Sequence, residues 1–147
     1  MSLFGCSNNT NTEMKNYDDY IKNHVKADDF CNIDKEIYYI YAYQIGCPPC
    51  SELRELIFNT LDSDIENLYL YDAENYRIHD KHKFKKRNDQ LTNEEMVLGM
   101  IEAKATCDIY MLSTPSLYIF KNNTLVKYEY EFYSIESTIK LLSKGDK

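Results

Sequence analysis

The stretch that decides the fold lies at residues 37–50 and reads Ile-Tyr-Tyr-Ile-Tyr-Ala-Tyr-Gln-Ile-Gly-Cys-Pro-Pro-Cys. Its first part, 37–45, is rich in Tyr and Ile, and this β-branched and aromatic content favours a buried central strand over a helix. Two prolines cannot continue such a strand, but proline is tolerated in the first turn of a helix. The pair Cys47 and Cys50 is therefore predicted to open a helix directly after a buried strand.

Regular elements are predicted on the C-terminal side of this stretch. A helical stripe in 51–61 is formed by Leu53, Leu56, Ile57 and Leu61. The segment 67–71 is predicted to be a short strand, so that 36–71 reads strand, helix, strand. A crossover of this kind predicts a parallel pair of strands.

The second half of the chain predicts a helix, a hairpin and a last helix. Thr92-Asn93-Glu94-Glu95 fits a capping box, which predicts a helix to about Lys104. The segment 116–120 reads as a strand, 121–124 as a turn and 125–132 as the returning strand. Ser134 is expected to cap the last helix, whose apolar positions are Ile135, Ile139 and Leu142.

The N-terminal region divides into a leader and the start of the domain. Residues 7–12 are polar and lack periodicity, so we predict a flexible leader over residues 1–11. Thr12 is expected to cap a helix that runs to about Asp29, since apolar residues recur there at three-to-five-residue spacing. Residues 12–147 are then predicted to form one domain.

Composition and charge exclude several classes of protein. The length of 147 residues, 44% of them hydrophobic, fits one globular domain of the usual ~100–200 residues. No apolar run approaches the ~18–20 residues of a membrane span. The net charge of −7 argues against a general nucleic-acid binder, which needs a basic footprint.

The charge is unevenly distributed. Residues 1–75 hold 5 basic and 14 acidic side chains, whereas residues 76–147 hold 12 basic and 10 acidic ones. A single run, 77–87, contains six of these basic side chains. We interpret the run as a solvated face, with a contact to an anionic partner or a membrane surface as the alternative.

The spacing of Cys47 and Cys50 points to redox chemistry. A helix N-terminus carries partial positive charge and unpaired N–H groups, which favour a thiolate. We expect Cys47 to be the exposed attacking thiol and Cys50 to lie deeper, where it resolves a mixed disulfide. Pro48 and Pro49 stiffen the loop between them.

A zinc site and a structural disulfide are the alternatives for these cysteines. Zinc normally takes four ligands, but Cys6, Cys31 and Cys107 stand singly, and His79 and His82 lie in a basic run that disfavours a cation. No metal ligand is therefore predicted. Five cysteines, an odd number, also exclude a fully paired disulfide scaffold.

Over roughly residues 34–144 the chain resembles the thioredoxin fold family. The resemblance rests on the strand 38–43, on Cys47-Pro48-Pro49-Cys50 opening a helix, and on Thr114-Pro115 directly before the strand 117–120. It implies a thioredoxin-like α/β three-layer sandwich: a mixed central sheet with helices on both faces, an N-terminal helix and a helical insertion before the strand 117–120. It also implies a cis peptide bond between Thr114 and Pro115.

The same resemblance implies a thiol–disulfide oxidoreductase acting on protein or peptide disulfides or dithiols. Cys47 would be the nucleophile and Cys50 the resolving thiol, with their disulfide as the only redox group and no further cofactor. The backbone of Thr114 would bind a peptide, and substrate contacts are also expected at Pro115, Pro48, Pro49 and Tyr43. The protein is expected to be monomeric and to have a membrane redox partner. The alternative is a non-catalytic adaptor or transport-accessory module, since the bacteriocin-transport accessory branch of the family looks similar.

Two positions depart from the family pattern. Gly46 stands where cytosolic members usually have Trp, and Tyr41, six positions before Cys47, stands where they have a buried acid. That acid assists proton transfer from the second thiol, so the base for Cys50 is missing or lies elsewhere. Glu36, Glu52 and Glu55 are candidates only by their proximity in sequence.

The remaining cysteines have separate interpretations. Leu3-Phe4-Gly5-Cys6, followed by a polar stretch, resembles the lipobox of bacterial lipoproteins. This predicts a lipid anchor at Cys6 and an extracytoplasmic location, with residues 1–3 replacing a removed signal segment; a cytoplasmic location is the alternative. Cys31 and Cys107 are predicted to be small buried or half-buried thiols, with pairing between them left open.

Overall fold

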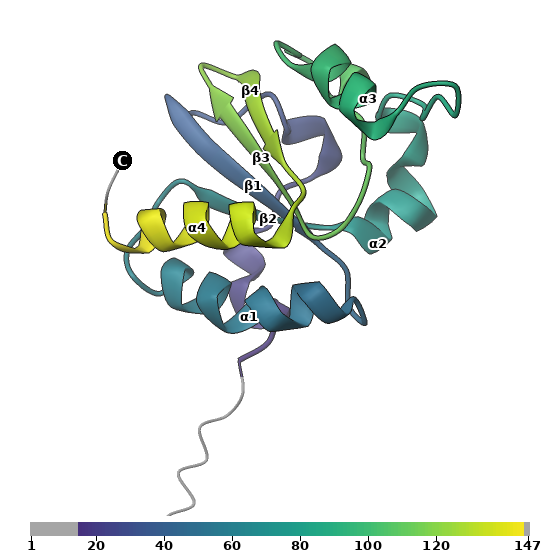
Figure 1. Cartoon of the computed structure of the whole chain (residues 1–147). Coiled ribbons are helices and arrows are strands. Elements are labelled where there is room, and N and C mark those ends of the chain that lie inside the picture. Colours follow the sequence, from purple (N-terminus) through teal and green to yellow (C-terminus); the bar gives the residue numbers. More distant parts are fainter. Residues whose placement is uncertain (1–14, 146–147) are drawn as a thin grey trace, which may run out of the picture.

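The computed structural model describes residues 15–145 and has a four-stranded sheet at its centre, in the order β2-β1-β3-β4 (Figure 1). The strands are β1 (Ile37–Tyr43), β2 (Leu68–Asp72), β3 (Ser116–Lys121) and β4 (Thr124–Glu129). The predicted leader and Cys6 lie outside the described residues.

The pairing of the strands follows from the connections between them. β1 and β2 are joined by α1 (Pro48–Leu61) and run parallel, which confirms the predicted parallel pair. β3 runs antiparallel to β1, and β4 runs antiparallel to β3. At the hairpin turn Asn122 and Asn123 have φ of 51° and 61°, as the favoured two-residue hairpin turn requires.

β1 is buried on both faces, which explains its unbroken apolar and aromatic sequence. Tyr38, Ile40 and Ala42 belong to the core on one face of the sheet, and Tyr41 and Tyr43 belong to the core on the other. All five are at most 2% exposed. The strand therefore joins both hydrophobic cores and carries the chain directly to Cys47.

Helices cover both faces of the sheet (Figure 1). α1 and α4 (Phe132–Ser143) pack on one face, and Leu53 and Ile139 lie in the core beneath them. The opposite face is covered by α3 (Asn93–Met100), which contributes Met96, and by short helical turns. The predicted thioredoxin-like α/β arrangement is therefore confirmed. Within residues 15–145, none of the helices has both the length and the apolar character that spanning a bilayer demands.

The predicted N-terminal helix is present, but it is shorter than the expected range of 12–29. A 3₁₀ helix spans Tyr17–Asn23 and is capped by Asn16 rather than by Thr12, which lies outside the described residues. After it the chain is extended, and the Val25 N–H donates to the carbonyl of Leu70 at 2.9 Å. Tyr20 packs on Phe58 of α1, whereas Ile21 is 72% exposed, and the spacing of the apolar residues alone did not distinguish this path from one helix.

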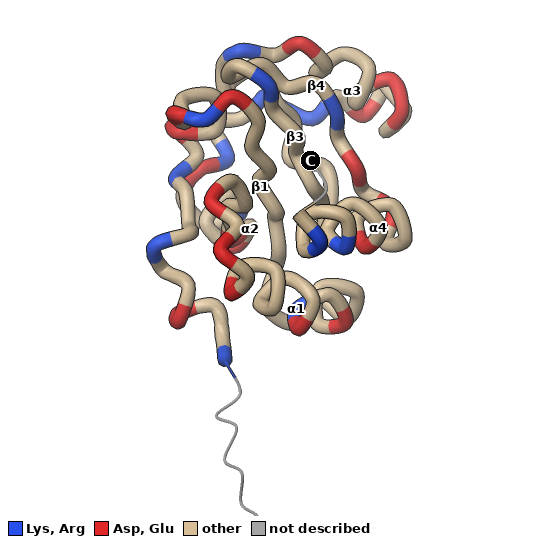
Figure 2. Tube along the Cα trace, turned by 90° about the vertical axis from the view of Figure 1, so that its left-hand side faces the viewer, with Lys and Arg blue, Asp and Glu red and all other residues tan. Residues whose placement is uncertain are grey.

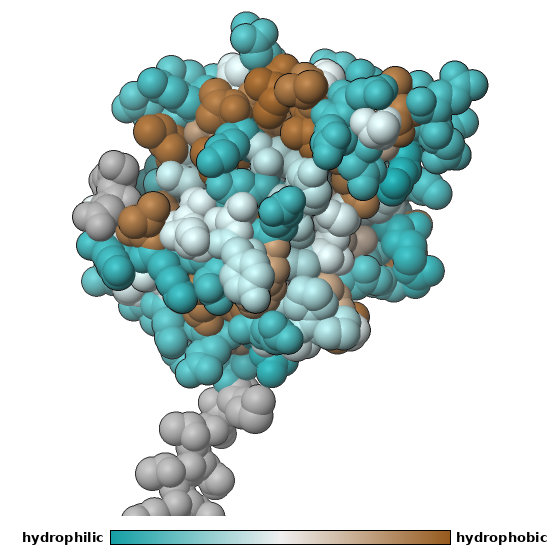
Figure 3. Space-filling model, in the orientation of Figure 1, coloured by the Kyte–Doolittle hydropathy of each residue, from teal (hydrophilic) through white to brown (hydrophobic). Residues whose placement is uncertain are grey.

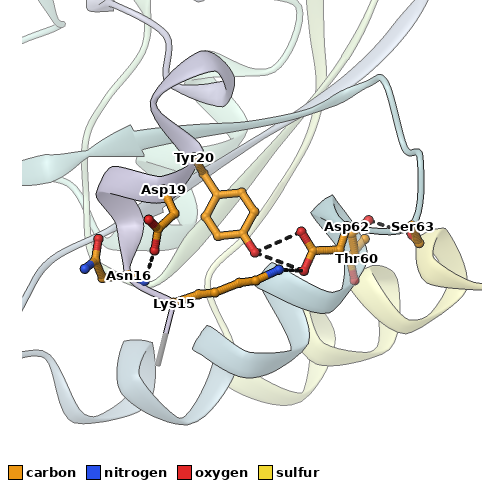
Figure 4. A network of polar contacts seen from close by, with 7 residues as sticks. All are labelled: Lys15, Asn16, Asp19, Tyr20, Thr60, Asp62 and Ser63. Atoms are coloured by element: carbon orange, nitrogen blue, oxygen red, sulfur yellow. Dashed lines mark hydrogen bonds and ion pairs between the residues drawn. The ribbon is translucent and has the colours of Figure 1, made fainter. Parts of the chain in front are cut away.

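Polar contacts fix this N-terminal segment to the end of α1 (Figure 4). Lys15 Nζ lies 2.6 Å from Asp62 Oδ2, and the Tyr20 hydroxyl donates to Asp62 Oδ1 at 3.0 Å. The hydrogen bond from Lys15, helped by that from Tyr20, lowers the pKa of Asp62 below its usual value. The segment is thereby held against α1, with Tyr17 beside β1.

The predicted helical insertion lies between β2 and β3. α2 (Ala73–Asn75) continues into a π-helical turn, Tyr76–Asp80, and a 3₁₀ turn, Lys81–Lys83, so the basic run starts on short helical turns. α3 ends at Met100 rather than near Lys104, because the chain turns there to pair with β4. Glu102 has φ of 78° and donates its N–H to the carbonyl of Leu125 at 2.7 Å.

The C-terminal elements are displaced slightly from their predicted bounds. β4 ends at Glu129, and α4 begins at Phe132 with Glu131, not Ser134, as its N-cap. Figure 3 shows hydrophobic residues gathered at the surface over the hairpin and α3. Leu98 of α3 and Val126 of β4 are 75% and 45% exposed.

Candidate active site

The start of α1 holds a disulfide between Cys47 and Cys50, whose Cα atoms are 5.2 Å apart. Cys47 is the N-cap of the helix, and its Sγ accepts a hydrogen bond from the Cys50 N–H at 3.3 Å. Cys47 is half-buried, whereas Cys50 is only 3% exposed. A reagent in solution therefore reaches Cys47 first, and a negative charge on that sulfur faces the positive end of the helix.

The residues around the disulfide explain how a strand changes into a helix within a few positions. Gly46 has φ of 90°, a conformation that side chains rarely adopt, and it makes the turn out of β1. Pro48 and Pro49 occupy the first two helical positions, where no intrahelical N–H bond is lost. Both prolines are exposed, so they form the surface beside Cys47.

The structure brings Thr114 and Pro115 to the disulfide. The Thr114–Pro115 peptide bond is cis, which confirms the prediction. Cys47 Sγ lies 3.6 Å from the carbonyl oxygen of Thr114. Thr114 is half-buried and Pro115 is buried, so the backbone of Thr114 is the part of this loop that borders the sulfur.

Tyr43 does not line the site, contrary to its predicted substrate contact. Its ring stacks on that of Tyr17 with centroids 3.5 Å apart, and its hydroxyl lies 2.7 Å from His24 Nε2. It is 2% exposed. Because the N-terminal segment covers it, Tyr43 is a core residue here.

Tyr41, the residue six positions before Cys47, lies in the same hydrophobic core as Cys50. Tyr41 is fully buried, and burial raises the pKa of its phenol. Within residues 15–145 its hydroxyl has no hydrogen-bond partner. Glu52 and Glu55 are exposed on α1, and Glu36 precedes β1 at the end of the strand away from the disulfide. None of the three candidate acids is placed to take the proton of Cys50.

Sequence reasoning missed three charged residues at this end of the molecule, of which Asp18 and Arg54 line a pocket beside Cys50 and Asp72 lies opposite Tyr43. A pocket of about 220 Å³ is lined by Asn16, Tyr17, Asp18, Gln44, Ile45, Gly46, Cys50, Ser51 and Arg54. Arg54 lies one helical turn after Cys50. Burial raises the pKa of the Tyr17 phenol to about 12, and the positive charge of Arg54 has a smaller effect in the opposite direction. Asp72 ends β2 opposite Tyr43. The predicted parallel pair could have located Asp72. The carboxyl ends of parallel strands lie at the same edge of a sheet, so the end of β2 lies on the same side as the end of β1, which Cys47 follows.

Comparison with known proteins gives structural similarity only. No protein-family model matches the chain, and no curated protein sequence matches it. The crystal structure of thioredoxin f2 from Chlamydomonas reinhardtii has a TM-score of 0.46 at 12% identity, over 84% of this chain and 96% of that one. Mitochondrial thioredoxin 3 from Saccharomyces cerevisiae has a TM-score of 0.44 at 13% identity, over 73% of this chain and 79% of that one.

At these scores and identities the matches carry no argument about activity. The class of fold rests on features of the chain itself: the strand order, the parallel pair β1 and β2, the disulfide at the start of α1 and the cis peptide bond beside it. Together they define a thioredoxin-like α/β fold with a Cys-Pro-Pro-Cys disulfide. The resemblance seen in the sequence is confirmed at the level of fold.

The other described cysteines, Cys31 and Cys107, are free and line one pocket together with His82 and Lys83 of the insertion. Cys31 is half-buried, and its burial, with smaller contributions from Asp108 and Cys107, raises its pKa to about 11. Cys107 is exposed. Within the described residues, no three His, Cys, Asp or Glu side chains are arranged to hold a metal ion.

Alkylation should separate these two thiols. At pH 8 iodoacetamide should label Cys107 well before Cys31, because only the thiolate reacts and a raised pKa leaves Cys31 almost fully protonated. The rate at Cys31 should rise steadily as the pH approaches 11. Peptide mass spectrometry after timed quenching measures both rates, and equal labelling at pH 8 would contradict the buried position of Cys31.

Proposed function

We propose that the protein is a thiol–disulfide oxidoreductase that acts on protein or peptide disulfides or dithiols. One observation carries the proposal: a partly exposed Cys47 caps a helix beside the Thr114 carbonyl, with a buried Cys50 bonded to it. The accessible sulfur is placed to attack, and the buried one is placed to resolve the product.

In the reductive direction, the Cys47 thiolate attacks one sulfur of a substrate disulfide. The other substrate sulfur leaves as a thiolate and takes a proton from solvent. The Cys50 thiolate then attacks Cys47 Sγ, which releases the second substrate thiol and closes the Cys47–Cys50 disulfide. Two electrons pass from the protein dithiol to the substrate, and the reverse sequence oxidises a substrate dithiol.

The chain's own groups assist these steps. The Cys50 N–H and the positive end of α1 stabilise the Cys47 thiolate, and the thiolate is the reactive form. The backbone of the half-buried Thr114 would offer hydrogen bonds to an extended peptide whose sulfur approaches Cys47. Since Tyr41 replaces an acid, the proton of Cys50 passes to solvent through the pocket beside it, and we expect resolution to be the slow step.

A trapping experiment tests the order of attack. Cys50→Ser removes the resolving sulfur, so a reduced variant mixed with a peptide disulfide should accumulate a covalent 1:1 adduct at Cys47. Intact-mass and peptide mass spectrometry identify the adduct. The same mixture with Cys47→Ser should give no adduct at Cys50, because that sulfur is buried. An adduct on Cys50 instead would reverse the assigned roles.

A non-catalytic adaptor is the second candidate, and the absence of an acid at Tyr41 favours it. An adaptor would bind its partner whether or not Cys47 is present. A disulfide exchange rate that depends on Cys47 therefore separates the two functions.

The location of the protein is also a proposal. Cys6 would anchor the chain through a lipid at an extracytoplasmic membrane surface, where oxidation or isomerisation of exported proteins, or reduction fed by a membrane partner, would be its task. Mass spectrometry of the N-terminal peptide from the native organism tests this proposal. An unmodified Cys6 in a soluble fraction would favour the cytoplasmic alternative.

A further inference from the structure

The basic run of the insertion is packed against the end of the molecule that holds the disulfide. Gln44, three residues before Cys47, donates a hydrogen bond to Glu74 of α2 at 3.4 Å. Arg87 donates to the carbonyl of Leu112 at 3.5 Å, two residues before Thr114. Figure 1 shows α2 on the same side of the molecule as the start of α1. The run is therefore a neighbour of the candidate active site.

A pocket of about 780 Å³ opens within this segment. It is lined by Tyr76, Lys81, His82, Phe84, Lys86, Arg87, Asp89, Met111 and Leu112. Three permanent cations face it together with a single carboxylate, and aromatic and apolar side chains form the remaining wall. Along the trace of the described chain, acidic and basic residues are otherwise interspersed (Figure 2).

The cations of the run fall into two groups. Arg77 pairs with Glu74, and Lys83 Nζ lies 3.1 Å from Asp28. Those charges are neutralised within the fold. By contrast, among residues 15–145 neither Lys81 nor Lys86, both on the pocket, takes part in an ion pair.

Arg87 belongs with the unpaired cations of the pocket. Its guanidinium is held by the Leu112 carbonyl and by Asn93 Oδ1 at 3.2 Å. A guanidinium has five N–H donors in a planar fork, so donors remain for a ligand. A positioned arginine next to two lysines without counterions is suited to bind carboxylates.

We infer that this pocket binds an Asp- or Glu-rich segment of the disulfide-bearing substrate while the substrate sulfur lies at Cys47. The inference rests on the proposed function and names its substrate class. A peptide paired with the backbone at Thr114 passes Leu112 and enters the pocket, whose volume exceeds that of a single small anion. The distant acids of this chain oppose the peptide little, since exposed charges are screened beyond about 8 Å at physiological salt. A flat anionic membrane fits a concave, partly aromatic pocket less well.

Peptide kinetics test the inference. Two peptides carry the same disulfide, one flanked by four Asp and Glu residues and the other by the matching Asn and Gln. Wild-type protein should exchange the acidic peptide with a kcat/KM about tenfold higher than the neutral one at low salt, as several partly screened ion pairs allow. The ratio should fall towards one at high salt.

Matched variants locate the effect. Lys81→Gln combined with Lys86→Gln should reduce the acidic-to-neutral ratio to about one or two, because both cations lack partners in the fold. Lys26→Gln combined with Lys121→Gln removes the same charge from exposed positions outside the pocket and should leave the ratio unchanged. A ratio near one for wild-type protein, or an equal fall in both double variants, would overturn the inference.

A binding experiment separates this inference from the proposed function. Protein carrying Cys47→Ser and Cys50→Ser cannot exchange disulfides, yet it should bind a fluorescent acidic peptide more tightly than the neutral one by anisotropy. If that preference appears while wild-type protein exchanges neither peptide, the proposed function fails and the pocket assignment stands. If the peptide preference is absent and vesicles of phosphatidylserine and phosphatidylcholine bind through Lys81 and Lys86, the run is a membrane contact and the inference is wrong.

Discussion

Replacing Cys47 by Ser should reduce disulfide exchange to the uncatalysed level, a loss of roughly a thousandfold or more, as for other catalytic nucleophiles. A serine hydroxyl stays protonated at neutral pH and cannot form the mixed disulfide, and Cys50 behind it is only 3% exposed. Insulin reduction driven by dithiothreitol and exchange with a fluorescent peptide disulfide both measure the loss. Titration of the Cys47 thiol should also give a pKa below the free value of about 8.5.

Cys107→Ser is the matched control for this variant. It makes the same chemical change at an exposed cysteine that lies on another pocket, so exchange should continue at the wild-type rate. Exchange that persists without Cys47 would contradict the oxidoreductase proposal. If neither the wild-type protein nor the Cys47→Ser variant exchanges disulfides, yet both still bind a partner protein, the adaptor function would be favoured.

Replacing Phe30 by Ala should destabilise the fold by about 3–5 kcal/mol, a large share of the ~5–15 kcal/mol that stabilises a typical domain. Phe30 is fully buried. Its ring centroid lies 5.1 Å from that of Tyr71, 5.2 Å from that of Phe84 and 5.5 Å from that of Tyr118. One truncation therefore leaves a cavity between the N-terminal segment, the sheet and the insertion. Urea unfolding followed by circular dichroism measures the change.

Tyr133→Ala is a suitable comparison for that variant. Tyr133 is 78% exposed on α4, so its removal should change the free energy of unfolding by no more than about 0.5 kcal/mol. A loss under about 1 kcal/mol for Phe30→Ala would mean that the surrounding rings collapse into the space or that the insertion packs elsewhere.

The central part of the fold was predictable because its signals are local. The aromatic run 37–45 predicts β1, the prolines after Cys47 predict the start of α1, and the residues around Asn122 predict the hairpin. Each signal acts within a few positions of the element that it specifies. The cis peptide bond at Thr114 followed only from the resemblance, since a proline before a strand has several ordinary conformations.

The N-terminal segment and the surroundings of the disulfide depend on distant contacts. Val25 pairs with Leu70, and Phe84 of the insertion packs on Phe30. The spacing of residues within the N-terminal segment or within the insertion therefore does not predict the course of either segment. Tyr43 is covered by Tyr17 for the same reason. Residue types near a cysteine indicate candidate side chains for the site, but only the packing shows which of them solvent can reach.

The single bridge between His24 and Leu70 also has a consequence for solubility. β2 lies at the edge of the sheet, and an uncovered edge strand offers unpaired N–H and C=O groups to other chains. His24 and Val25 contact β2 at that edge, and the residues before them are attached to α1 through Lys15 and Tyr20. A protein shortened to begin at residue 26 would keep its dithiol but lose Tyr20 from one core, and β2 would be an open edge strand ready for self-association.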